Sequence, residues 1–142
     1  MNAAARLTAI HDSYRSLPGW VQIWVGLILT PVNAAGFFLL GTFSGQATAL
    51  AAVVVVLTNL PIMWHYAGMN KAMSIPHLFA WIPLHVALVG RLVGAYGEGP
   101  LELSEWLLAV AVLVVNTISL LFDLVDSWGW LQGDRATPGH DS

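Results

Sequence analysis

Polar side chains recur at alternating steps of three and four residues along the last apolar stretch of the chain. The positions are Glu102, Glu105, Ala109, Val112, Asn116, Ser119, Asp123 and Asp126, six of them polar. In an α-helix this spacing places all eight side chains on one face, which we call the polar stripe. Carboxylates at both ends with amide and hydroxyl groups between them attract cations. One hypothesis is therefore that several copies of the stripe line an oligomer axis and conduct cations, protons or small solutes.

Ion pairing between helices is the alternative for the same carboxylates, and the one that we favour. The candidate pairs join Arg91 to Glu102 or Glu105, and Arg15 or Lys71 to Asp123 or Asp126. Each acidic pair lies within about a turn of the water phase, where a carboxylate costs much less than at the bilayer centre. The stripe would then hold one subunit together.

A second group of polar residues lies near mid-depth of the expected spans. Its members are Asn33, Asn59, His85, Asn116 and Ser119, most of them close to a proline or threonine. We favour hydrogen bonds between helices and to carbonyls freed by proline, each contributing about 0.6 kcal/mol in a membrane. The alternative is a mid-membrane binding pocket or water-filled pathway, because broken helices and converging amides build such sites in transporters and channels.

The loop between the second and third spans carries the residues most typical of metal ligands. They are His65, Met69, Met73 and His77. Thioether and imidazole groups suit Cu(I), and two histidines on adjacent helices can hold haem iron, which would make the chain a redox subunit. Methionine is also ordinary apolar filler, and interfacial histidine commonly contacts headgroups. We therefore expect no cofactor, and the absence of Cys removes thiolate sites from consideration.

The elements that position these residues follow from composition. Charged residues make up 9% of the 142-residue chain and hydrophobic residues 57%, with a mean hydropathy of +0.71. Ordinary soluble domains carry roughly 25% charged residues. No Asp, Glu, Lys or Arg occurs between Arg15 and Lys71, a gap long enough for two membrane helices of about 20 residues each. The sequence therefore predicts a single all-α membrane domain, a four-transmembrane-helix bundle.

We place the segments as follows, with a short amphipathic helix on the membrane surface first and a polar, frayed tail last. The ranges are 2–17 for the amphipathic helix, 20–40, 48–66, 76–96 and 102–127 for the spans, and 132–142 for the tail. The first apolar run continues to Leu40, so we interpret it as a span and not as a cleaved signal peptide. Gly90 and Gly94 form a G-x-x-x-G motif, which favours close helix approach and self-association.

Orientation and function class follow from charge. Four of the five cations fall on one side of the spans, so a bacterial-type inner membrane protein would keep both termini in the cytoplasm. Five cations and a pI near 5.9 exclude a nucleic-acid surface. No catalytic motif is present. We expect a non-enzymatic membrane protein that contacts the lipid bilayer and either self-associates or serves as an accessory subunit of a larger membrane complex.

Overall fold

The computed structural model describes residues 1–140, and every regular element in that range is helical. Four helical segments are long and apolar enough to cross a membrane: Gly19–Phe38, Phe43–Tyr66, Lys71–Leu92 and Leu103–Leu131. A short helix, α1 (Ala3–Arg15), precedes them. The predicted all-α, four-span bundle with an amino-terminal helix is confirmed.

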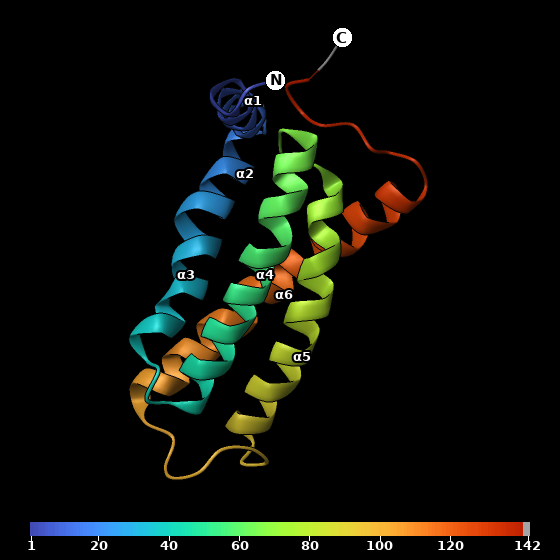
Figure 1. Ribbon diagram of the computed structural model, residues 1–142. Coiled ribbons are helices and arrows are strands. Elements are labelled where there is room, and N and C mark those ends of the chain that lie inside the picture. The colour runs from blue at the N-terminus through green and yellow to red at the C-terminus, as the bar shows by residue number, and fades with distance from the viewer. Residues whose placement is uncertain (141–142) are drawn as a thin grey trace.

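Both ends of the chain lie at the same end of the bundle, which we call the terminal end (Figure 1). There α1 lies above the first span, beside the end of α4, and the opposite, loop end holds the connections at 39–42 and 93–102 (Figure 1). Helix α5 (Ser74–Leu92) packs against both α4 (Phe43–Tyr66) and α6 (Leu103–Leu131), and α6 crosses behind them at a tilt (Figure 1). These three helices form the centre of the bundle.

The first span is broken into four short pieces because it contains Pro31, which has no backbone N–H. The pieces are α2 (Gly19–Ile23), a π-helical turn η1 (Trp24–Leu29), α3 (Thr30–Ala34) and a 3₁₀ turn η2 (Ala35–Phe38). Side chains satisfy nearby carbonyls: Thr30 Oγ1 donates to Val25 O at 2.7 Å, and Asn33 Nδ2 donates to Leu29 O at 2.9 Å. No side chain of α2 or η1 is buried, so this half of the span packs loosely on its neighbours.

Several span boundaries differ from the sequence prediction, and two of the differences have a clear local cause. Helix α4 begins at Phe43 because Thr42 caps it, with Thr42 Oγ1 accepting from Gly45 N at 3.0 Å. Helix α5 ends at Leu92 because Gly94 takes a left-handed φ of 81° and Ala95 N donates to Gly90 O at 2.7 Å. Helix α6 continues to Leu131, four residues beyond the predicted 127.

The ending of α5 also corrects our interpretation of the G-x-x-x-G motif. Gly94 is the helix terminator and not part of a helix face. Gly90 is covered by the Tyr96 ring, and a Cβ at this position would lie 2.1 Å from Tyr96 Cδ2. Both glycines therefore serve the end of one helix, and the motif gives no support to self-association.

The buried apolar core lies between α4, α5 and α6. Its members are Ala51, Ala80, Trp81, Leu84, Leu88, Leu108, Ala109 and Val112. Many larger apolar side chains point outward instead, among them Leu57, Phe79 and Val125. This distribution suits a bundle surrounded by lipid tails, where helices gain from close packing and outward-facing apolar groups carry no penalty.

The tail does not fray as predicted over residues 132–140. Asn70 Nδ2 donates to Arg135 O at 2.9 Å and to Thr137 Oγ1 at 3.1 Å, and the Arg135 guanidinium lies 4.1 Å from the Trp130 ring centroid. These contacts hold the tail against the turn between α4 and α5. Residues 141 and 142 of the predicted tail lie outside the described residues.

Candidate functional site

The polar stripe of α6 faces the inside of the subunit. Glu105, Ala109, Val112, Asn116, Ser119 and Asp123 are all buried, whereas Glu102 is exposed and Asp126 is half-buried. Because Val112 and Asn116 have no exposed surface, these positions do not line an oligomer axis in this arrangement. The buried polar members Glu105, Asn116, Ser119 and Asp123 each contact another segment of the same chain.

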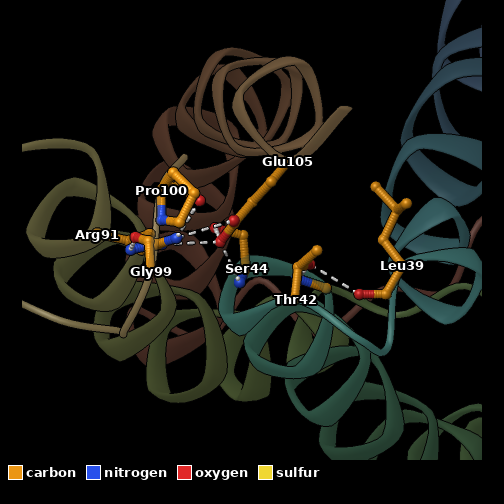
Figure 2. A network of polar contacts seen from close by, with 8 residues as sticks. Leu39, Thr42, Ser44, Arg91, Gly99, Pro100 and Glu105 are labelled. Carbon is orange, nitrogen blue, oxygen red and sulfur yellow. Dashed lines mark hydrogen bonds and ion pairs between the residues drawn. The ribbon is translucent and has the colours of Figure 1, made fainter. Parts of the chain in front are cut away.

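At the loop end, Glu105 is the centre of a closed network (Figure 2). Arg91 Nε donates to Glu105 Oε1 at 2.9 Å and Arg91 Nη2 donates to Oε2 at 3.1 Å. Ser44 N and Oγ donate to Oε1 at 3.1 and 3.0 Å, and the guanidinium also donates to the carbonyls of Gly99 and Pro100. The expected Arg91–Glu105 pair therefore forms, with both charges satisfied, and it ties α4, α5, α6 and a loop together.

Two contacts at mid-depth join the first span to α6. Asn33 Nδ2 donates to Asn116 Oδ1 at 2.7 Å and Asn116 Nδ2 donates to Asn33 Oδ1 at 2.9 Å. The indole of Trp24 donates to Ser119 Oγ at 2.8 Å. These reciprocal bonds hold the loosely packed first span to α6.

His85 lies apart from these amides. Its ring nitrogens lie 2.7 Å from Trp81 O and 3.0 Å from Thr117 Oγ1. These contacts are local: Asn33 pairs with Asn116, Ser119 with Trp24, and His85 with Thr117.

Asn59 belongs to a different group, nearer the terminal end. Asn59 Nδ2 lies 3.1 Å from His77 Nε2, and His77 Nδ1 lies 3.4 Å from Asp123 Oδ1. The imidazole also stacks on Trp81, with ring centroids 4.4 Å apart and planes 17° apart. We call Asn59, His77, Trp81 and Asp123 the polar cluster; it joins α4, α5 and α6.

Several atoms of the polar cluster lack hydrogen-bond partners. They are Asn59 Oδ1, Asp123 Oδ2, His77 Nδ1 and Trp81 Nε1, although His77 Nδ1 is within ion-pair distance of Asp123. An unpaired buried polar atom costs about 1 to 3 kcal/mol, and native structures contain few of them. The loop-end network has no such deficit, so the polar cluster is the place where an additional partner would be most favourable.

A cavity of about 790 Å³ lies beside the polar cluster, between the first span, α4 and α6. All four residues of the polar cluster, Asn59, His77, Trp81 and Asp123, lie on one wall of this cavity. Its remaining walls are largely apolar and aromatic, including Trp20, Trp24, Phe37, Ala52, Val55, Val56 and Phe122. Sites for small molecules commonly enclose about 300 to 1,000 Å³ with few polar groups, and this cavity falls in that range.

The terminal end of the cavity is bordered by charged groups. Lys71 forms an ion pair with Asp134, and Asp126 lies on the same wall. Lys71 was predicted to pair with Asp123 or Asp126, which is wrong because the tail folds back and supplies Asp134. The hydrogen bond from Lys71 lowers the pKa of Asp134 below its ordinary value. Arg15, the other predicted partner, instead donates to Gln22 Oε1 at 3.1 Å.

The expected metal-ligand cluster is divided by the fold. His65 is exposed at the end of α4 and makes an edge contact with the Tyr66 ring, 4.9 Å between centroids. Met69, Met73 and His77 line the cavity. Within residues 1–140, no three His, Asp or Glu side chains come together in a manner suited to a metal ion.

Sequence reasoning missed two tryptophans of the site. The position of Trp24 near the end of an apolar span is typical of an interfacial aromatic residue, but its indole N–H bonds to Ser119 inside the subunit. Trp81 carries no sequence signal beyond being aromatic in a span, and only the fold stacks it on His77.

No family model, curated protein or solved structure matches this chain. The geometry of the cavity and its polar cluster is therefore the basis for inferring function.

Proposed function

We propose that this membrane protein binds an amphipathic, membrane-soluble molecule in the cavity between the first span, α4 and α6. The observation that carries the proposal is the combination of a 790 Å³, mainly apolar cavity with a wall of buried polar atoms that lack partners. The polar group of the ligand would bind at Asn59 and Asp123. Its apolar part would extend between α4 and the first span toward Phe37.

Binding fits this cavity better than passage across the membrane. The polar side chains of Thr30 and Asn33 on the first span are hydrogen-bonded within the protein. The part of the cavity that extends along α4 is otherwise lined by Ala34, Phe37, Ala52, Val55 and Val56, which offer no polar path for an ion. From α6 only Ser119, Phe122, Asp123 and Asp126 reach the cavity, and the stripe before Ser119 is packed. We therefore favour a non-enzymatic binding role over permeation.

We further propose that the cavity opens toward the cytoplasmic side of a bacterial-type inner membrane. Four cations belong to segments at the terminal end: Arg6, Arg15, Lys71 and Arg135. Arg91, at the loop end, is buried and paired with Glu105.

The orientation can be tested by labelling. Because the chain contains no Cys, single cysteines placed at Asn2 and Glu98 can be labelled separately in intact cells. An impermeant maleimide should label only the Glu98 position; labelling of Asn2 alone would reverse the orientation.

Ligand binding can be tested with an uncharged, photoreactive long-chain alcohol in liposomes. Crosslinks should concentrate on cavity segments of α4 and η1, and Ala52→Phe, which fills the cavity wall, should reduce them strongly. Ala111→Phe is the matched control, since Ala111 is exposed on the outer surface of α6. Equal labelling of the cavity and the outer surface in all three proteins would refute the proposed function.

A further inference from the structure

We infer that the molecule bound in the cavity carries a positive charge: a lipophilic cation of the ammonium or phosphonium type. This inference rests on the proposed function, because it names the class of ligand for the same cavity. It follows from the charges, the unpaired atoms and the aromatic side chains on the cavity walls.

The charged residues on the walls are mainly acidic. Among residues 1–140 the lining includes one lysine, Lys71, and three aspartates, Asp123, Asp126 and Asp134. Lys71 is engaged by Asp134. The carboxylates of Asp123 and Asp126 therefore remain, and no other Lys or Arg of this part of the chain lines the cavity. A cationic ligand would supply the missing charge, whereas an anion would meet two carboxylates in a poorly screened environment.

The polar cluster itself offers mostly acceptors. Asn59 is 7% exposed and Asp123 is 8% exposed. The unpaired atom Asn59 Oδ1 is an acceptor, and the unpaired Asp123 Oδ2 is also an acceptor when the carboxyl is ionised. Trp81 Nε1 is the unpaired donor on this wall. An ammonium group, with up to three N–H donors, matches two such acceptors better than a carboxylate or phosphate would.

His77 has a neighbour at each ring nitrogen. Asn59 Nδ2 lies 3.1 Å from His77 Nε2. His77 Nδ1 lies 3.4 Å from Asp123 Oδ1, and Asp123 Oδ2 has no partner. The Asp123 carboxylate therefore contacts the imidazole through one oxygen and keeps the other for a further partner.

The aromatic walls favour the same class of ligand. Trp20, Trp24, Trp81, Phe37 and Phe122 line the cavity, and the Trp20 and Phe122 rings lie 5.6 Å apart. Aromatic faces attract cations, most strongly where water is excluded. An apolar chain gains little by leaving lipid for an apolar cavity, so selectivity must come from these electrostatic contacts.

The test compares two ions of the same shape and opposite charge, tetraphenylphosphonium and tetraphenylborate. Binding is measured by equilibrium dialysis with the whole protein in nanodiscs of phosphatidylcholine, which has no net charge. Tetraphenylphosphonium should bind at one site per chain. The affinity for tetraphenylborate should be lower by about tenfold or more. Dodecylammonium should displace the phosphonium ion at lower concentration than dodecanol. Equal binding of the two tetraphenyl ions would overturn the inference.

Variants locate the site. Asp123→Asn and Asp126→Asn should each weaken tetraphenylphosphonium binding about tenfold. Glu102→Gln removes the same charge from an exposed position at the other end of α6 and should leave binding unchanged. Asp123→Asn is set aside if it disturbs folding, seen as aggregation on size exclusion. Asp126→Asn then decides the question, because Asp126 is half-buried and its replacement disturbs the packing less. An equal loss in Glu102→Gln would show a general charge effect and overturn the inference.

The two proposals fail in different ways. In the first case the photoreactive alcohol labels the cavity and Ala52→Phe blocks that labelling, but tetraphenylphosphonium and tetraphenylborate bind equally well. The binding site then stands, and its ligand is not cationic. If neither probe responds to Ala52→Phe, both proposals are wrong.

Discussion

The guanidinium of Arg91 in α5 and the carboxylate of Glu105 in α6 form a two-point ion pair inside the bundle, with N–O distances of 2.9 and 3.1 Å. Both carboxylate oxygens of Glu105 and the Ser44 hydroxyl are hydrogen-bonded, whereas Asp123, on the same face of α6, keeps an unpaired oxygen. The two ends of one polar stripe therefore have different roles. The loop end joins helices, and the terminal end borders a cavity.

Replacement of Glu105 by Gln should destabilise the bundle strongly. The change leaves the Arg91 guanidinium buried without its counter-charge, a situation that costs about 3 to 5 kcal/mol in proteins. Reversible unfolding in mixed micelles with increasing denaturing detergent measures the effect, with Glu102→Gln as the control at an exposed carboxylate of the same helix. A loss below about 1 kcal/mol, the usual size for an exposed ion pair, would mean that the pair is hydrated.

The Asn33–Asn116 pair should show energetic coupling in a double-mutant cycle. Asn33→Leu and Asn116→Leu each break both amide bonds, so the double variant should lose less than the sum of the two single losses. We expect a coupling of about 0.6 to 1.7 kcal/mol, the range for hydrogen bonds between membrane helices. Thr58→Val serves as control, since its hydroxyl bonds only to carbonyls of its own helix. Strict additivity would show that the two amides do not meet.

Gly36→Ala should push the first span away from α4. A Cβ at Gly36 would lie 2.9 Å from Thr48 Cβ and 3.0 Å from the backbone nitrogen of Ala49, which cannot move easily. Overpacking of this kind costs about 1 to 3 kcal/mol. Gly41→Ala is the matched control because nothing lies within 4 Å of its added Cβ. Thermal unfolding in detergent that gave the same midpoint for both variants would contradict the close contact.

Docking of the tail should weaken at low pH. The hydrogen bond from Lys71 holds the pKa of Asp134 below its ordinary value, so the contribution of this pair is present above that ordinary value, near 3.8. It is lost as the pH falls through the depressed pKa of the folded state, where the carboxyl becomes protonated. Limited proteolysis at residues 132–140 should therefore accelerate with an acid-stable protease as the pH falls below about 4.

Asp134→Asn should produce the same acceleration at neutral pH, and Asp12→Asn on the exposed face of α1 should not. If the tail of the Asp134→Asn protein is as protected as that of the unaltered protein, the Lys71–Asp134 pair does not hold it.

The sequence predicted which face of the last helix is buried, because spacing by threes and fours depends only on the geometry of one helix. It also predicted the Arg91–Glu105 pair, since both residues lie close to the same short loop. Lys71 was assigned to the wrong carboxylate because its true partner, Asp134, lies on a tail expected to fray. Self-association remains a prediction, and Gly90 and Gly94 no longer support it.

By itself, the sequence determined that the helices are surrounded by lipid, how many spans there are and which face of α6 points inward. These follow from hydropathy and helical period, which are local properties of the chain. Only the tertiary structure decided that Asn59 meets His77, that Asn33 meets Asn116 and that a cavity opens beside Asp123. Those contacts depend on how far each helix slides and tilts against its neighbours. In lipid, many packings bury similar apolar area, so the choice among them falls to a few polar pairs and close glycine contacts that join residues distant in the chain.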